Sequence, residues 1–68
     1  MKLREVRLEQ GLSQRQLAAV MFPGRARRIS SVNICQIERG IRAPWPAFRV
    51  EVARVLGVSE LELFDNDN

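Results

Sequence analysis

The chain has 68 residues and a net charge of +3, with 46% hydrophobic and 28% charged residues, which is typical of one small globular domain and unlike a disordered segment. One cysteine and no histidine exclude an intramolecular disulfide and a cysteine/histidine zinc cage. Ten of the eleven basic residues are arginine, which suits bidentate contacts with phosphates and guanine edges. The preference for arginine codons in a GC-rich or thermophilic genome would give the same composition.

Helical periodicity predicts a first helix over residues 2–10, and Gly11 suits the left-handed conformation that ends many helices. Ser13 and Gln16 have the spacing of a capping box, so a second helix is expected to begin at Ser13. Pro23 and Gly24 end it. The residues expected to share the inner faces are Leu3, Val6 and Arg7 in the first helix and Leu17, Ala18, Val20 and Met21 in the second.

A polar connection, residues 25–28, leads to a third helix over residues 30–39. Ser30 or Ser31 can cap it, and Gly40 ends it. Ile34 and Ile37 are three residues apart, so they are expected to share the buried face of this helix.

Two more helices are expected after the extended connector 43–46. Pro46 fits the first turn of the fourth helix, and Gly57 ends it. Ser59 and Glu62 form a second capping box, which opens a short last helix. The apolar residues expected to pack are Phe48, Val52, Val55 and Leu56 in the fourth helix, and Leu61 or Phe64 in the last. No segment alternates like a strand, so the prediction is one all-α domain of five helices over residues 1–64, followed by a polar end, residues 65–68.

The outer side of the third helix carries small and amide side chains. Asn and Gln can bond adenine N6 and N7 together, and a valine can contact a thymine methyl group. The N-termini of helices attract phosphates, which makes Ser13 and Ser30 candidate phosphate contacts. The candidate base-reading residues are Ser31, Val32, Asn33 and Gln36.

Six stretches follow one another in an order and spacing that is specific as a set. They are Leu12-Ser13-Gln14-Arg15-Gln16-Leu17-Ala18, Ile29-Ser30, Ile34-Cys35-Gln36-Ile37-Glu38-Arg39-Gly40, Ala43-Pro44, Ala53-Arg54-Val55-Leu56-Gly57-Val58-Ser59 and Leu63-Phe64. Over about residues 3–64 the chain resembles the phage Cro/cI-type repressors, the XRE-like helix-turn-helix family. The resemblance implies a five-helix lambda-repressor-like DNA-binding domain that acts as a homodimer on a near-palindromic operator.

The resemblance also assigns roles by position. It places phosphate contacts at Gln14, Arg39, Gly40 and Arg42. It places base reading at Ser31, Val32 and Gln36, with Asn33 beside them. It further implies an ion pair between Arg7 and Glu38 that ties the first helix to the third.

The chain departs from the family at the connection between the second and third helices. A single glycine is usual there, whereas this chain has the longer segment 22–28. Such length is tolerated because loop-closure entropy grows slowly. The angle of the third helix must then come from core packing, for which Phe22 and Ile29 are candidates. The arginines of this segment either add phosphate contacts or form a solvated loop, and they are Arg25, Arg27 and Arg28.

Three further features have two interpretations each. Cys35 is either a redox switch or a contact in the DNA groove. The more usual role of a lone cysteine is that of a small, partly buried packing residue. Trp45 either contacts a second copy or packs over the fourth helix. The last helix, with Leu61, Leu63 and Phe64, either lines a dimer interface or contributes to the core.

Together these patterns predict sequence-specific binding of double-stranded DNA by a small transcriptional regulator, a repressor by resemblance. No nucleophile–base set or phosphate loop is present, so no enzyme activity, metal or cofactor is expected. The alternative is a protein-interaction module or antitoxin-type regulator that binds a protein partner through the same fold. A third hypothesis, binding of single-stranded nucleic acid, is weaker because the chain lacks the exposed aromatic stacking platforms that such proteins use. Residues 1–7 are polar and apolar runs are short, so no signal peptide, no membrane span and a cytoplasmic location are expected.

Overall fold

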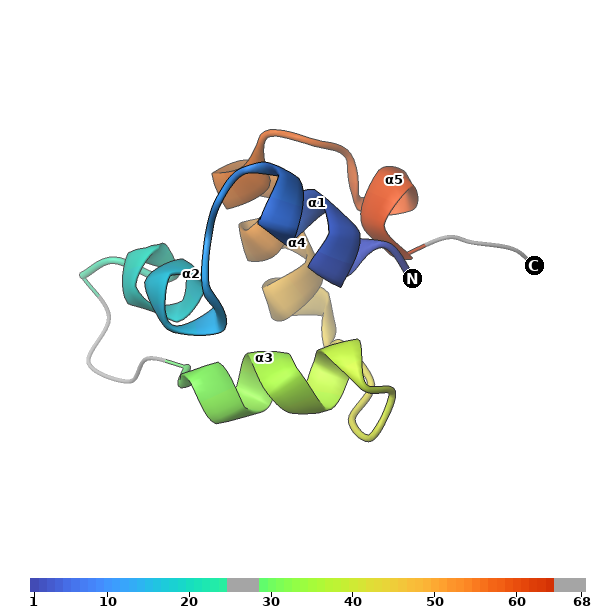
Figure 1. The fold of residues 1–68 in the computed structure, drawn as a ribbon, viewed down its shortest axis with the longest axis horizontal. Coiled ribbons are helices and arrows are strands. Elements are labelled where there is room, and N and C mark those ends of the chain that lie inside the picture. Colours follow the sequence, from blue (N-terminus) through green and yellow to red (C-terminus); the bar gives the residue numbers. More distant parts are fainter. Residues whose placement is uncertain (25–28, 65–68) are drawn as a thin grey trace.

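The computed structural model describes residues 1–24 and 29–64 of the chain. Over these residues the protein is all-helical and has no strand. Its helices are α1 (Leu3–Glu9), α2 (Gln14–Val20), α3 (Ser31–Glu38), α4 (Pro46–Leu56) and α5 (Glu60–Phe64). These agree with the predicted helices to within two residues at each end. Figure 1 shows α3 along one edge of the molecule, with α2 at one end of it and α1 and α4 on its inner side.

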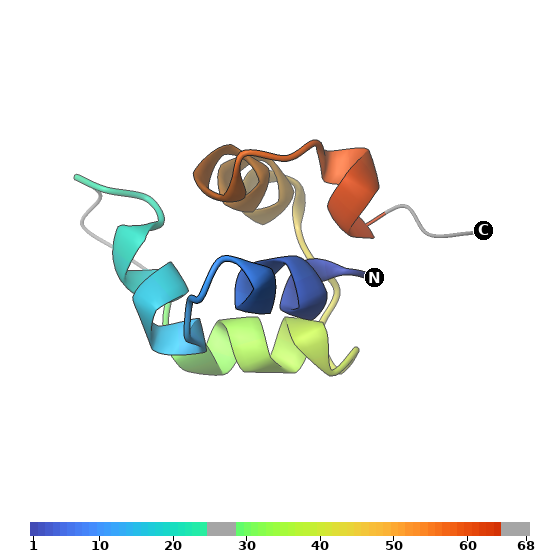
Figure 2. The same cartoon turned by 45° about the horizontal axis from the view of Figure 1, so that its top comes forward.

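The core is a single cluster to which every helix contributes. The side chains at 0% exposure are Leu3, Leu17, Met21, Ile34, Ile37, Phe48, Val52 and Leu63. Figure 2, turned from the first view, shows α1 between α3 and α4. Among the described residues no helix has the length and apolar character needed to cross a membrane.

Most predicted core positions are buried, but Val20 was assigned wrongly. Val20 in α2 is 48% exposed, because the buried side of this helix is formed by Leu17, Ala18 and the following Met21, and Val20 lies to one side of it. In α5 the fully buried residue is Leu63, whereas Leu61 is 67% exposed and Phe64 packs at the edge of the core. Leu63 therefore cannot line a dimer interface.

Glycines with positive φ end α1 and α3 by the same hydrogen-bond pattern. After α1, Gly11 has φ 74°, its N–H donates to Leu8 O at 2.9 Å, and the Leu12 N–H donates to Arg7 O at 3.1 Å. After α3, Gly40 has φ 78° and the Ile41 N–H donates to Gln36 O at 2.9 Å. This is the Schellman motif, which satisfies the last carbonyl groups of a helix.

The end of α2 differs, because a phenylalanine rather than a glycine adopts the left-handed conformation. Phe22 has φ 53°, a rare value for a bulky side chain, with a cost of about 1–3 kcal/mol. The Phe22 ring and the Ile29 side chain both pack, half-buried, against the core. The two residues expected to replace the tight turn therefore do contact the core on either side of the connection.

Candidate nucleic-acid interface

The inner face of α3 attaches the helix firmly to the domain. Ile34 and Ile37 are both fully buried in the core cluster. Contacts between α2 and α3 are the most extensive between any two helices of the described residues. With its inner face held in this way, α3 can present only its outer face to a partner.

A buried ion pair also joins α3 to α1. Arg7 Nε lies 2.7 Å from Glu38 Oε2, and Arg7 Nη2 lies 3.0 Å from Glu38 Oε1. The two side chains are 5% and 2% exposed. Arg7 Nη1 donates to Leu12 O at 2.7 Å, and Gln14 Nε2 donates to Glu38 Oε1 at 3.0 Å. Such a bidentate, charge-assisted pair fixes orientation more surely than it adds stability. The pair that the family resemblance implied is thus present, and it includes Gln14 of α2.

The N-terminal end of α2 has the expected capping box. The Ser13 hydroxyl accepts from the Gln16 N–H at 2.9 Å, and the Ser13 N–H donates to Gln16 Oε1 at 2.8 Å. The Ser13 hydroxyl proton is not used by this box, so it is able to donate to an anion such as a phosphate. The Gln14 amide, a candidate phosphate contact, shares its donors with Glu38.

The N-terminal end of α3 uses one of the candidate base readers as a cap. Asn33 Oδ1 accepts from the Ser30 N–H at 3.0 Å and from the Ser30 hydroxyl at 3.3 Å. Bidentate recognition of adenine needs both the oxygen and the NH₂ group of an amide. Base reading by Asn33 therefore requires this cap to open, whereas within residues 1–24 and 29–64 no hydrogen bond ties the Gln36 side-chain amide in the same way.

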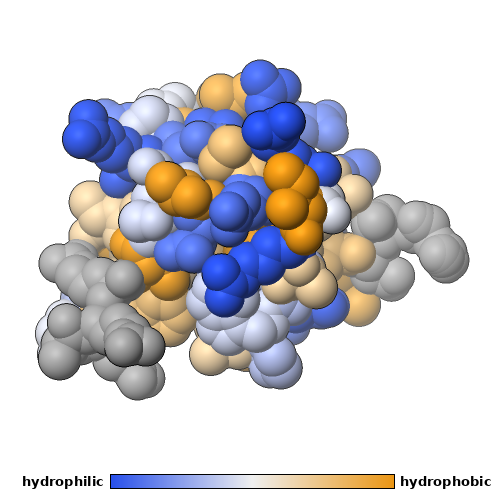
Figure 3. Space-filling view, turned by 90° about the horizontal axis from the view of Figure 1, so that it is seen from below, coloured by the Kyte–Doolittle hydropathy of each residue, from blue (hydrophilic) through white to orange (hydrophobic). Residues whose placement is uncertain are grey.

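The outer face of α3 is hydrophilic with small apolar patches, as the view from its side shows (Figure 3). Val32 is 59% exposed, while Ser31 and Gln36 are half-buried on the helix. Cys35 is also half-buried. Small and amide side chains of this kind can enter the major groove of DNA and contact base edges.

Arginines lie beyond the C-terminal end of α3. Arg39 and Arg42 are both exposed, and the Arg42 guanidinium carbon lies 4.9 Å from the centre of the Trp45 ring. The Trp45 ring lies 5.3 Å from that of Phe48. Trp45 therefore packs over α4, which was the second of its two predicted roles. Its ring also contacts Arg42 at the edge of the candidate interface. The predicted loop contacts Arg25, Arg27 and Arg28 lie outside the described residues.

Two features of this region have no clear signal in the sequence. Glu51 of α4 accepts a hydrogen bond from the backbone of Phe22, although the two are 29 residues apart. Asn33 serves as the partner of Ser30. The second had a weak signal, since an amide three residues after an N-cap serine resembles the capping-box spacing.

Comparison with known proteins gives no match: no family model, no curated protein and no solved structure resembles the chain significantly.

Proposed function

We propose that the protein binds double-stranded DNA sequence-specifically and acts as a transcriptional regulator, with α3 in the major groove. The observation that carries this proposal is the contrast between the two faces of α3. Its inner face is held by two fully buried isoleucines and by the Glu38 ion pair, while its outer face presents polar side chains together with the exposed Val32. A recognition helix needs both properties, because base contacts discriminate only if the helix is held at a fixed angle.

The charges around α3 support the same proposal. Arg39 and Arg42 lie at the C-terminal end of the helix, and Ser30 lies at its capped N-terminal end. Phosphate contacts at both ends of a reading helix set its register on the duplex. A second copy on a two-fold related half-site would complete a near-palindromic operator, as repressors of this general shape require.

The proposal is tested by selection of random double-stranded oligonucleotides with the purified protein at a stated physiological salt concentration. We expect an enriched motif with two-fold symmetry. Gln36→Ala is expected to weaken binding to that motif by about 5- to 150-fold, the worth of one bidentate base contact, and to relax the preference at one base position. Gln10→Ala is a matched control, since that side chain bonds Leu56 O on α4 rather than lying on α3. No enriched motif would refute the proposal and favour the protein-interaction module.

A salt titration tests the phosphate contacts separately. Replacing Arg39 and Arg42 together by alanine is expected to reduce the slope of log affinity against log salt concentration by about 2, one unit for each lost phosphate contact. The matched control replaces Lys2 and Arg4, two exposed cations at the start of α1. It removes the same charge and should leave the slope nearly unchanged. Equal slopes for the two double variants would show that the Arg39–Arg42 end does not contact DNA.

A further inference from the structure

The chain leaves α2 in a conformation that its own residues do not favour. Phe22 has φ 53°, and side chains with a Cβ seldom adopt this left-handed region. Pro23 follows it, and a proline disfavours the helical conformation for the residue before it. Local preferences therefore end α2 here, but they do not select the left-handed backbone that is observed. A tertiary contact has to maintain it.

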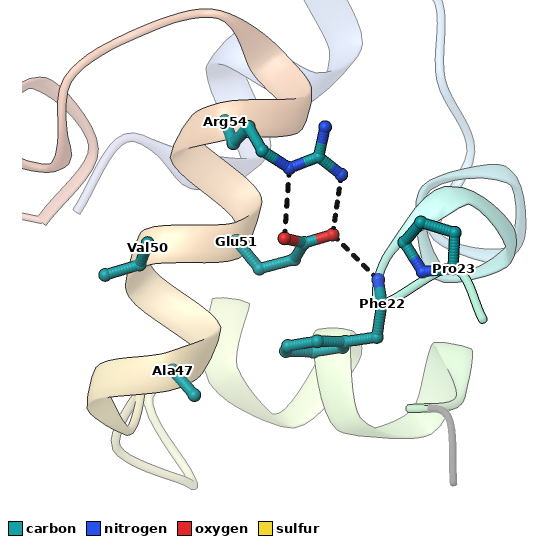
Figure 4. A pocket seen from close by; sticks show the side chains of 6 residues that line it. All are labelled: Phe22, Pro23, Ala47, Val50, Glu51 and Arg54. Atoms are coloured by element: carbon teal, nitrogen blue, oxygen red, sulfur yellow. Dashed lines mark hydrogen bonds and ion pairs between the residues drawn. The ribbon is translucent and has the colours of Figure 1, made fainter. Parts of the chain in front are cut away.

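Glu51 of α4 makes such a contact. The Phe22 N–H donates to Glu51 Oε2 at 2.7 Å, a short bond of the charge-assisted type. The Glu51 side chain is 14% exposed. Figure 4 shows the carboxylate pointing from α4 toward the Phe22 nitrogen, and the Phe22 ring extending from its backbone toward α4. This bond joins the end of α2 to the middle of α4.

Arg54 holds the same carboxylate in place from one turn further along α4. Its Nε lies 3.1 Å from Glu51 Oε1, and its Nη2 lies 2.8 Å from Glu51 Oε2. These hydrogen bonds, and then the negative charge of Glu51, raise the pKa of Arg54 above its ordinary value. The guanidinium fixes the plane of the carboxylate, so that one oxygen is directed at the Phe22 N–H.

The position of α2 matters for α3 because the two helices pack against each other. In a helix-turn-helix unit with a short turn, that turn itself restricts the angle between them. Here residues 22–28 replace it. We propose that Glu51 is a positioning residue for α3: by bonding the Phe22 backbone it fixes the end of α2 against α4, and thereby the angle at which α3 meets DNA.

This inference rests on the proposed function, and its first test measures DNA discrimination. Glu51→Ala is compared with Glu5→Ala, which removes an exposed carboxylate from α1 and changes the net charge equally. Both should bind non-specific DNA alike. We expect Glu51→Ala to lower the ratio of specific to non-specific affinity by about tenfold, close to the loss of one base contact, while Glu5→Ala leaves the ratio unchanged. Equal ratios for two folded variants would overturn the inference.

The second test needs no DNA and separates failure of the inference from failure of the proposed function. Amide hydrogen exchange and amide chemical shifts are measured in the wild type, in Glu51→Gln and in Glu5→Gln. Glu51→Gln keeps the size of the side chain but removes its charge and one of the two acceptor oxygens that Arg54 and Phe22 use, and it is the variant better able to fold. We expect exchange at Phe22 to accelerate by about tenfold, and shifts along α3 to change, only in Glu51→Gln. Unchanged α3 shifts would overturn the inference even if the wild type selects a DNA motif. Changed shifts without any DNA selectivity would retain Glu51 as the residue that positions α3 and refute the DNA-binding proposal alone.

Discussion

Glu38→Ala is expected to lower the free energy of unfolding by about 3–5 kcal/mol, because it leaves the buried guanidinium of Arg7 without its carboxylate. The guanidinium cannot reach water easily, since its side chain is only 5% exposed. A domain of this length has roughly 3–10 kcal/mol of stability in total. The variant should therefore be partly or wholly unfolded at 25 °C, as measured by circular dichroism and urea titration.

The matched control replaces both charges at once, Arg7→Met with Glu38→Leu. Apolar side chains of similar volume remove the unpaired charge, so most of the lost stability should return. The recovery is expected to be incomplete because Leu12 O and the Gln14 amide lose partners. If the double variant were as unstable as Glu38→Ala, the packing of these side chains rather than their pairing would account for the effect. A stable double variant that discriminates DNA poorly would show that the pair serves to orient α3.

Ile34→Ala should have the second largest effect, a loss of about 2–5 kcal/mol in the free energy of unfolding. Ile34 is fully buried, and its truncation leaves a cavity in a closely packed core. Val32 lies two residues away on the same helix and is 59% exposed, so Val32→Ala should change stability by less than about 0.5 kcal/mol. Both substitutions truncate a branched side chain, and urea titration compares them directly.

The same pair should show the opposite order in DNA binding once each folded fraction is accounted for. Val32→Ala is expected to reduce affinity at the selected motif by removing an apolar contact with a thymine methyl group. Ile34→Ala should bind with near-normal affinity per folded molecule. A large loss of stability in Val32→Ala would contradict the assignment of an inner and an outer face to α3.

Local signals predicted the helices well, because their ends depend on residues a few positions apart. The predicted capping box of Ser13 and Gln16 begins α2, and Pro46 begins α4. Gly11 and Gly57 end α1 and α4, as predicted. Periodicity likewise identified Ile34 and Ile37 as the buried side of α3. The Arg7–Glu38 pair spans 31 residues, and only the family resemblance indicated it.

Features that depend on tertiary contacts could not be read from the chain in this way. The periodicity of α2 includes both Val20 and Met21. Only Met21 is buried, although it lies just beyond the last residue of the helix, whereas Val20 is exposed. Leu61 or Phe64 was predicted to pack, and the full burial of Leu63 depends on how α5 docks. The bond from Phe22 to Glu51 involves a backbone group, so no side-chain pattern marks it. Such contacts arise once the helices are packed and leave no periodic trace.

The docking of α5 on the start of the chain has a consequence for truncated chains. The Lys2 N–H donates to Leu63 O at 2.8 Å, and Leu63 is fully buried beside residues of α1 and α4. Figure 1 shows α5 near the N-terminal end of α1. A chain that stops before residue 63 lacks this buried side chain and the carbonyl group that accepts from Lys2. The described domain is therefore expected to fold as one cooperative unit, and a truncation within α5 is expected to leave an aggregation-prone fragment rather than a smaller stable domain.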